Sequence, residues 1–172
     1  QESLKKPIDD VFSVFDVEPL AAASLSQVHR AVLKKEGDIV SVKIQRPDIK
    51  KKIEADLDIL ETMANFLDQK FDPLKAYNLP ELVEVIRRHL MTETDFTAEL
   101  RNMKIARSFS AGTPITIPDG YDAYCTEKVL VMEFVQGARY SEVLPGSPYD
   151  GERFGKQGLA AATKQILEDG FF

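Results

Sequence analysis

Apolar and polar residues alternate most regularly between Ile39 and Gln45. The residues of one face of this segment are Val40, Val42 and Ile44, and those of the other face are Ile39, Ser41, Lys43 and Gln45. This alternation predicts a half-buried β-strand with Lys43 at its centre, on the face opposite the apolar one. The run from Pro19 to Leu33 predicts the strand before it. A turn at 34–38, which ends in Gly37-Asp38, joins the two strands as a hairpin.

Five further segments carry apolar residues at helical spacing. They are residues 1–18, with Pro7 in the first turn and Ile8, Val11, Phe12 and Phe15 on one face; residues 48–70, with Asp48 as the cap; residues 78–90; residues 93–109; and residues 152–168, stopped by Gly170. This period predicts amphipathic helices that bury one face. Proline suits a first helical turn, and glycine suits the left-handed position that follows a last turn.

Two short stretches predict further strands of the same sheet. Residues 115–117 precede a Pro118-Asp119-Gly120 turn, and residues 128–135 form an apolar run that we expect to be buried on both faces near its middle. Residues 137–151 contain three glycines and two prolines and predict a linker or rim loop.

One acidic residue lies inside an apolar helical stripe. The stripe of residues 93–109 consists of Phe96, Leu100, Met103 and Ala106, and Glu99 falls within it. A buried carboxylate without a partner is costly, so the fold must supply a cation or hydrogen-bond donors, or keep the group neutral. Lys43 is the natural partner. The alternative is an acid at the edge of the stripe that leans into water.

Composition narrows the classes of function. The chain has 172 residues, 44% hydrophobic and 29% charged, which suffices for one domain with a core or for one and a half small lobes. A net charge of −6 argues against nucleic-acid partners, because a phosphate backbone requires a basic surface. The single Cys125 excludes an internal disulfide and a cysteine zinc site and fits a reducing compartment. No spanning run or signal peptide is found, and the start at Gln1 indicates a processed or excised piece.

The order of these segments resembles the N-lobe of a protein kinase: a small-residue loop, a Val-x-Val-Lys strand, a helix with an inward glutamate and a strand ending in Val-Met-Glu-Phe. The motifs are closer to one branch. Ala21-Ala22-Ala23-Ser24, Gln27-Val28-His29, Val42-Lys43-Ile44-Gln45-Arg46-Pro47 and Glu93-Thr94-Asp95-Phe96 with Glu99 resemble the UbiB (AarF-type) kinase-like family, which is associated with ubiquinone biosynthesis. The resemblance spans nearly the whole chain, and the motifs keep the family's order.

The resemblance implies a nucleotide site. Lys43 would hold the α and β phosphates of ATP and pair with Glu99, and the alanine loop, formed by Ala21, Ala22, Ala23 and Ser24, would replace the glycine-rich phosphate loop. Alanine restricts the positive φ values that glycine permits, so nucleotide handling is expected to differ from that of an ordinary kinase. Met132 falls at the gatekeeper position, where a plain core role fits equally well. Glu133 to Val135 would be the hinge that binds adenine through backbone groups.

Two acids match a regulatory motif of that family. Glu93 and Asp95 correspond to its Glu-x-Asp pair, which lies over the site where a protein substrate would otherwise bind and engages an upstream Lys-x-Gly-Gln element. This chain contains no Lys-x-Gly-Gln sequence.

The residues of phosphoryl-transfer chemistry are missing from the sequence. In this fold the reaction requires an Asp-x4-Asn catalytic loop and a metal-holding Asp. The asparagines Asn65, Asn78 and Asn102 follow Leu60, Pro73 and Thr97 by five positions, and the Asp-Phe pair at 95–96 is followed by threonine and lies on the wrong element. In the family, a motif resembling residues 165–172 leads directly into the catalytic segment. We therefore expect no catalytic or metal-binding residue within this chain, and expect the Mg ligands beyond Phe172.

The resemblance implies an α+β fold, namely a protein-kinase-like N-lobe with a five-stranded antiparallel sheet and helices, plus the start of the C-lobe. The expected divisions are an N-terminal helical extension at 1–18, the N-lobe at 19–136, and a linker with the first C-lobe helix at 137–172. The first hypothesis is the ATP-binding lobe of an atypical kinase or ATPase linked to ubiquinone biosynthesis, inactive as this fragment. The second is a non-catalytic scaffold that binds a partner protein or membrane lipid, with the last helix, Phe171 and Phe172 covered by another chain. An unrelated α+β domain is the least favoured alternative.

Location is constrained only by the resemblance and the cysteine count. A bacterial cytoplasm with peripheral membrane or quinone-lipid contact is the default, and an organellar origin with a removed transit peptide fits the missing start equally well. The basic run at 50–52 fits contact with phosphates or a membrane surface, although a solvated face balanced by nearby acids is the favoured interpretation.

Overall fold

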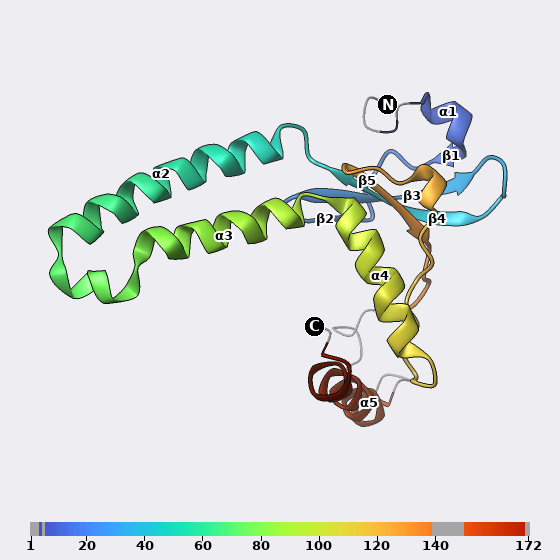
Figure 1. Cartoon of the computed structure of the whole chain (residues 1–172). Helices are drawn as coiled ribbons and strands as arrows, with labels where there is room; N and C mark the ends of the chain where they lie inside the picture. Colours follow the sequence, from blue (N-terminus) through green and yellow to red (C-terminus); the bar gives the residue numbers. More distant parts are fainter. Residues whose placement is uncertain (1–3, 5, 139–149, 171–172) are drawn as a thin grey trace.

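The computed structural model of the chain describes residues 4, 6–138 and 150–170 (Figure 1). One antiparallel sheet lies at its centre. Its strands are β1 (Phe12–Phe15), β2 (Ala21–Ala22), β3 (Ser26–Leu33), β4 (Ile39–Gln45) and β5 (Val129–Glu133). The strand order is β1-β3-β4-β5, and β2 pairs with β3 as well. The predicted five-stranded antiparallel sheet is therefore confirmed.

The β3–β4 hairpin places Lys43 in the middle of the sheet. Lys43 lies opposite Val28 of β3 on one side and Leu130 of β5 on the other. The hairpin turn contains Gly37 with a φ of +79°, a left-handed conformation that glycine adopts without a steric penalty. The turn predicted at 34–38 is therefore confirmed.

Both faces of the sheet are covered. One cluster joins Val40 and Val42 of β4 to residues of β1, β3 and β5, and a second joins Leu130 of β5 to helix α4 (Phe96–Ser110). Ser41 and Gln45 are buried too, so the prediction of a half-buried strand with one wet face is wrong for β4. The strand is central, and a central strand receives cover from both layers.

The N-terminal segment differs from its prediction. Only one helical turn forms, α1 (Ile8–Val11), and Phe12 and Phe15 belong to strand β1 instead of a helix face. Phe12 pairs with Leu33 and Phe15 with Ala31, so the edge of β3 provides the ladder that an isolated helical turn cannot.

The first predicted strand is split into two. β2 pairs through Ala21 with Val28 and through Ala22 with Gln27, and the chain reverses between them, where the Ala23 amide donates to the Ser26 carbonyl at 2.9 Å. The segment from Pro19 to Leu33 is thus a hairpin with unequal arms, in which the short β2 pairs with the start of the long β3.

The strand predicted at 115–117 does not form. The outer edge of β5 is occupied by the next few residues: Gly120 makes a bridge with Met132, and the Tyr121 amide donates to the Val131 carbonyl at 2.9 Å. Prolines at 114 and 118 flank the predicted strand and remove ladder donors, which explains the outcome. The run at 128–135 does form a strand buried at Val129, Leu130 and Val131, as predicted.

Two long helices form a hairpin that projects from the sheet (Figure 1). They are α2 (Ile49–Lys70) and α3 (Leu79–Glu93), which pack through Leu57, Ala64 and Val83. Asp48 precedes α2 but makes no side-chain cap, which corrects the prediction; it has a φ of +55° and pairs with Lys51. None of the helices in the described ranges combines the length and apolarity needed to cross a bilayer.

The predicted helix at 93–109 is shorter at its start. Glu93 ends α3, the chain turns at Thr94 and Asp95, and α4 begins at Phe96. Figure 1 shows α4 running from this turn toward α5 (Gly151–Lys164), which continues as a π-helical turn to Asp169. Gly170 has a φ of +60°, as predicted for a left-handed cap. The predicted linker at 137–151 lies mostly outside the described residues, as do Phe171 and Phe172.

Candidate functional site

The structure brings Lys43 and Glu99 together. Lys43 Nζ donates to both carboxylate oxygens of Glu99, at 2.6 and 2.8 Å, across 56 positions of sequence. Strand β4 fixes the lysine and helix α4 fixes the acid, and the side chains are 25% and 38% exposed. The Lys43 ammonium also lies 4.7 Å from the ring centroid of the buried Phe96, close enough for a cation–π contact. The predicted partner of the acid in the apolar stripe is therefore correct.

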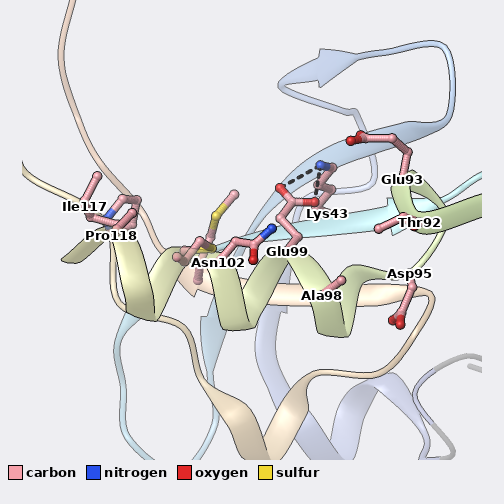
Figure 2. Close-up of a pocket in the computed structure, with 12 residues that line it drawn as sticks. Lys43, Thr92, Glu93, Asp95, Ala98, Glu99, Asn102, Ile117 and Pro118 are labelled. Carbon is pink, nitrogen blue, oxygen red and sulfur yellow. Dashed lines mark hydrogen bonds and ion pairs between the residues drawn. The ribbon is translucent and has the colours of Figure 1, made fainter. Parts of the chain in front are cut away.

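The ion pair lies in a cleft with a volume of about 480 Å³ (Figure 2). The wall contributed by α4 carries Ala98, Glu99, Asn102, Met103 and Ala106. Figure 2 shows Thr92 and Glu93 on one side of the ion pair and the apolar Ile117 and Pro118 on the other, and Met132 also lines the cleft. Lys43 is the one cation among the described residues that line the cleft. The site therefore holds one cation among three carboxylates, Glu93, Asp95 and Glu99, and its volume is within the size range of small-molecule sites.

Glu93 and Asp95 point in different directions, although both line the cleft. Figure 2 shows the Glu93 side chain reaching toward Lys43, whereas the Asp95 carboxylate points away from the ion pair. Asp95 is the N-cap of α4, because its Oδ1 accepts hydrogen bonds from the Thr97 amide at 2.8 Å and from the Thr97 hydroxyl at 2.6 Å. The two acids of the motif thus have separate local roles: one faces the cleft and the other starts the helix that carries Glu99.

Replacing Asp95 by alanine is expected to destabilise the lobe by about 1 kcal/mol, as for other lost N-caps. Hydrogen bonds from the Thr97 hydroxyl and backbone hold the pKa of Asp95 below its usual value. A carboxylate with a depressed pKa stabilises the fold above its unfolded pKa of about 3.9, and this contribution is lost as the pH falls through the lower folded pKa. Denaturation of wild type and Asp95→Ala should therefore differ at pH 7 and converge in the acid range. An equal difference at all pH values would contradict the capping role.

The other predicted site residues lie outside the cleft lining. Glu133 and Val135 are exposed at and beyond the end of β5, and only Met132 of the predicted gatekeeper and hinge lines the cleft. The alanine loop, Ala21 to Ser24, is exposed and has no positive φ angle. Arg46 Nε donates to the Ala23 carbonyl at 3.1 Å and so ties the loop to the end of the lysine strand. The phosphate and adenine roles of these residues stay predictions.

Sequence reasoning assigned no site role to three polar residues in or near the cleft. Asn102 lines it one helical turn after Glu99, and Thr92 lines it just before the Glu-x-Asp motif. Gln45 Nε2 donates to the Thr94 carbonyl at 2.8 Å, and neither residue lines the cleft. Two signals were available, because Asn102 is at i+3 from Glu99 on a helix and Gln45 is at i+2 from Lys43 on a strand, which places each pair on one face.

Metal-binding chemistry is not apparent in the described part of the chain. No group of three or more His, Cys, Asp or Glu side chains there could hold a metal ion. Cys125 is half-buried, and burial raises the pKa of its thiol, so it has none of the thiolate character of a reactive cysteine.

The sheet, the inward helix and the strand-to-helix ion pair define a protein-kinase-like N-lobe. The ABC1 atypical kinase-like domain family matches the chain over residues 1–172, and the chain belongs to this family. A relative in Arabidopsis thaliana, "Protein ACTIVITY OF BC1 COMPLEX KINASE 1, chloroplastic", is 34% identical over 100% of this chain and 26% of its own length. "Probable protein kinase UbiB" of Aeromonas salmonicida is 34% identical over 100% of the chain and 32% of its own length. An uncharacterised Clostridium pasteurianum protein is 36% identical over 99% of the chain.

These comparisons confirm the resemblance seen in the motifs. They also give a size relation, because the chain spans about a quarter to a third of the length of the curated relatives it matches. The boundaries at 18 and 136 and the assignment of 137–172 to a second lobe stay predictions.

Proposed function

We propose that this chain is the ATP-binding lobe of a longer atypical kinase or ATPase. The observation that supports the proposal most directly is the 2.6 Å ion pair between Lys43 and Glu99 in the cleft. A lysine that a carboxylate holds in place presents its remaining N–H donor in a fixed direction, which suits an oxygen of a phosphate chain. In this proposal Lys43 contacts the α and β phosphates and Glu99 orients it.

In this proposal a nucleotide occupies the cleft. The phosphates would lie beside Lys43, the one cation among the described lining residues, and the adenine would lie toward Met132 and the backbone of Glu133 to Val135. The alanine loop would cover the phosphates with a backbone that lacks the positive φ angles of a glycine loop.

A magnesium ion would neutralise the phosphates when bound, but the described residues offer it no ligand set. We therefore propose that its ligands, the catalytic base and the phosphoryl acceptor site belong to the remainder of the protein. We also propose that this chain alone does not transfer phosphate, and the absence of an Asp-x4-Asn sequence from it supports both parts of the proposal.

The biological setting is proposed from family membership. Relatives carry the printed name UbiB, and we propose that the parent protein acts in prenyl-quinone lipid biosynthesis, at the periphery of a membrane. An organellar origin is equally consistent with the chloroplastic relative.

One observation favours a second candidate function, a partner-binding scaffold. Helix α5 and the turn after it expose Phe154, Leu159, Ile166 and Leu167. Exposed apolar side chains on one helix are typical of a surface that another element covers, and either the C-lobe of the same protein or a separate partner would provide that cover.

A nucleotide titration separates the two candidates. The full-length protein is titrated calorimetrically with a non-hydrolysable ATP analogue and Mg, and then with adenosine. We expect saturable binding of one analogue per protein and weaker binding of adenosine, because adenosine has no phosphate for Lys43. A protein that binds neither compound would fit the scaffold and not the enzyme.

A further inference from the structure

The turn between α3 and α4 decides where the acids of the cleft lie. This turn, residues 93–96, is called the elbow below. Glu93 is the last residue of α3, Asp95 caps α4, and Glu99 follows one helical turn after the cap. Any rotation or slide of the elbow would therefore move Glu93 and Glu99 together relative to Lys43.

The Gln45 side chain holds the elbow through the main chain of the elbow. Its side-chain amide donates to the Thr94 carbonyl at 2.8 Å, and both residues are buried. The Thr94 hydroxyl donates in turn to the Met91 carbonyl at 2.7 Å, at the end of α3. A second tether comes from the turn that precedes β5, because the Phe96 amide donates to the Glu127 carbonyl at 3.0 Å.

Gln45 and Lys43 both lie on β4, and both contact the segment formed by the elbow and α4. They are two residues apart on β4, so their side chains lie on one face of the sheet. One contacts the elbow at Thr94 and the other contacts α4 at Glu99, five residues later. Because the elbow at the start of α4 is tied to Gln45 and the Glu99 side chain on α4 is tied to Lys43, α4 cannot turn about its axis without breaking one contact or distorting the elbow.

We propose that Gln45 is a positioning residue for the nucleotide site, and that it acts by setting the elbow so that Glu99 meets Lys43. This inference rests on the proposed function, since it concerns the same cleft. Glutamine suits the task because it supplies a neutral donor. A methionine of similar size would leave the buried Thr94 carbonyl without its partner, and a charged donor would have to be desolvated.

The test uses Gln45→Met in the full-length protein. We expect the dissociation constant for the Mg-bound ATP analogue to rise about ten-fold, in the range of ordinary coupling between sites. In a Glu99→Ala background the same substitution should have little further effect, because Gln45 acts through Glu99. Such non-additivity is what a double-mutant cycle measures, and a merely destabilising change would not produce it. Val40→Ala is the matched control: Val40 is buried in the opposite layer of the same strand, and its effect on affinity should be small and additive.

Two outcomes would overturn the inference. Additive effects of Gln45→Met and Glu99→Ala would show that Gln45 does not act through Glu99, and unchanged affinity in Gln45→Met would show that it does not act on the site. Failure of the proposed function is recognised separately, because Lys43→Met would then bind nucleotide as wild type does. In that case hydrogen exchange of the Phe96 amide, which lies in the elbow, tests whether Gln45 holds the elbow. This amide must exchange faster in Gln45→Met than in Val40→Ala, and equal rates would reject the positioning role.

Discussion

Substituting Lys43 by methionine in the full-length protein is expected to weaken binding of the Mg-bound ATP analogue by about 30-fold or more. Lys43 is the one cation among the described residues of the cleft, and Glu93 and Glu99 add negative charge there. Losing the partner of a partly desolvated phosphate costs about 2–5 kcal/mol in affinity. Methionine keeps most of the length and apolar stem of the lysine, so the change isolates the charge.

The fold should survive this substitution. Glu99 is 38% exposed, so its carboxylate can be hydrated when the lysine is gone, and a half-exposed ion pair contributes only about 1 kcal/mol or less. Lys35→Met, in the exposed β3–β4 turn, is the matched control and should bind nucleotide as wild type does. Lys43→Arg should not restore affinity fully, because a planar guanidinium cannot replace a point charge in a fixed geometry. If Lys43→Met and Lys35→Met bound equally well, the phosphate site would lie elsewhere.

The parts of this site that the sequence predicts are those that follow from local periodicity. The period of two along β4 places Lys43 and Gln45 on one face, and the helical period after Phe96 places Glu99 within an apolar stripe. An acid in such a stripe requires a partner, and that requirement links two segments 56 positions apart without any knowledge of the fold.

The parts that the sequence does not predict depend on long-range pairing. Phe12 and Phe15 fit a helix face and a strand equally well, and only the exposed edge of β3 makes the strand the better choice. Residues 115–117 look extended, but the edge of β5 is already paired by Gly120 and its neighbours. The opposite orientations of Glu93 and Asp95 follow from a break between two helices, because the capping bond to Thr97 outweighs continuation of the helical pattern.

The alanine loop shows that a match to a family motif does not by itself establish the role of the matching residues. Its residues match a family pattern in sequence, and the structure forms them into a short hairpin held by Arg46, and none of them lines the cleft. A role over the phosphates depends on what binds beneath the loop, which no local pattern encodes.

Replacing Phe96 by alanine is expected to be the most destabilising of the substitutions considered, by about 3–5 kcal/mol, as for other buried phenylalanines. Phe96 is 1% exposed, packs with Leu100 and Leu130, and supports the Lys43 ammonium with its ring. Its removal would leave a cavity between α4 and the sheet. Hydrogen exchange of the β5 amides in the full-length protein is the appropriate measurement, because it reports the opening of this lobe apart from the rest of the protein.

Phe66→Ala provides the contrast, since Phe66 lies on α2 with 57% of its surface exposed. It should change the free energy of opening obtained from the same exchange rates by no more than about 0.5 kcal/mol. Phe96→Leu separates the two contributions of the ring. It retains much of the buried apolar volume but offers no π face, so stability should largely recover while Lys43 loses its cation–π contact. The loss of binding free energy for the nucleotide in Phe96→Leu should therefore exceed the loss of folding free energy. Equal exchange in Phe96→Ala and Phe66→Ala would mean that α4 is not packed on the sheet through this ring, and the geometry that brings Glu99 to Lys43 would need another support.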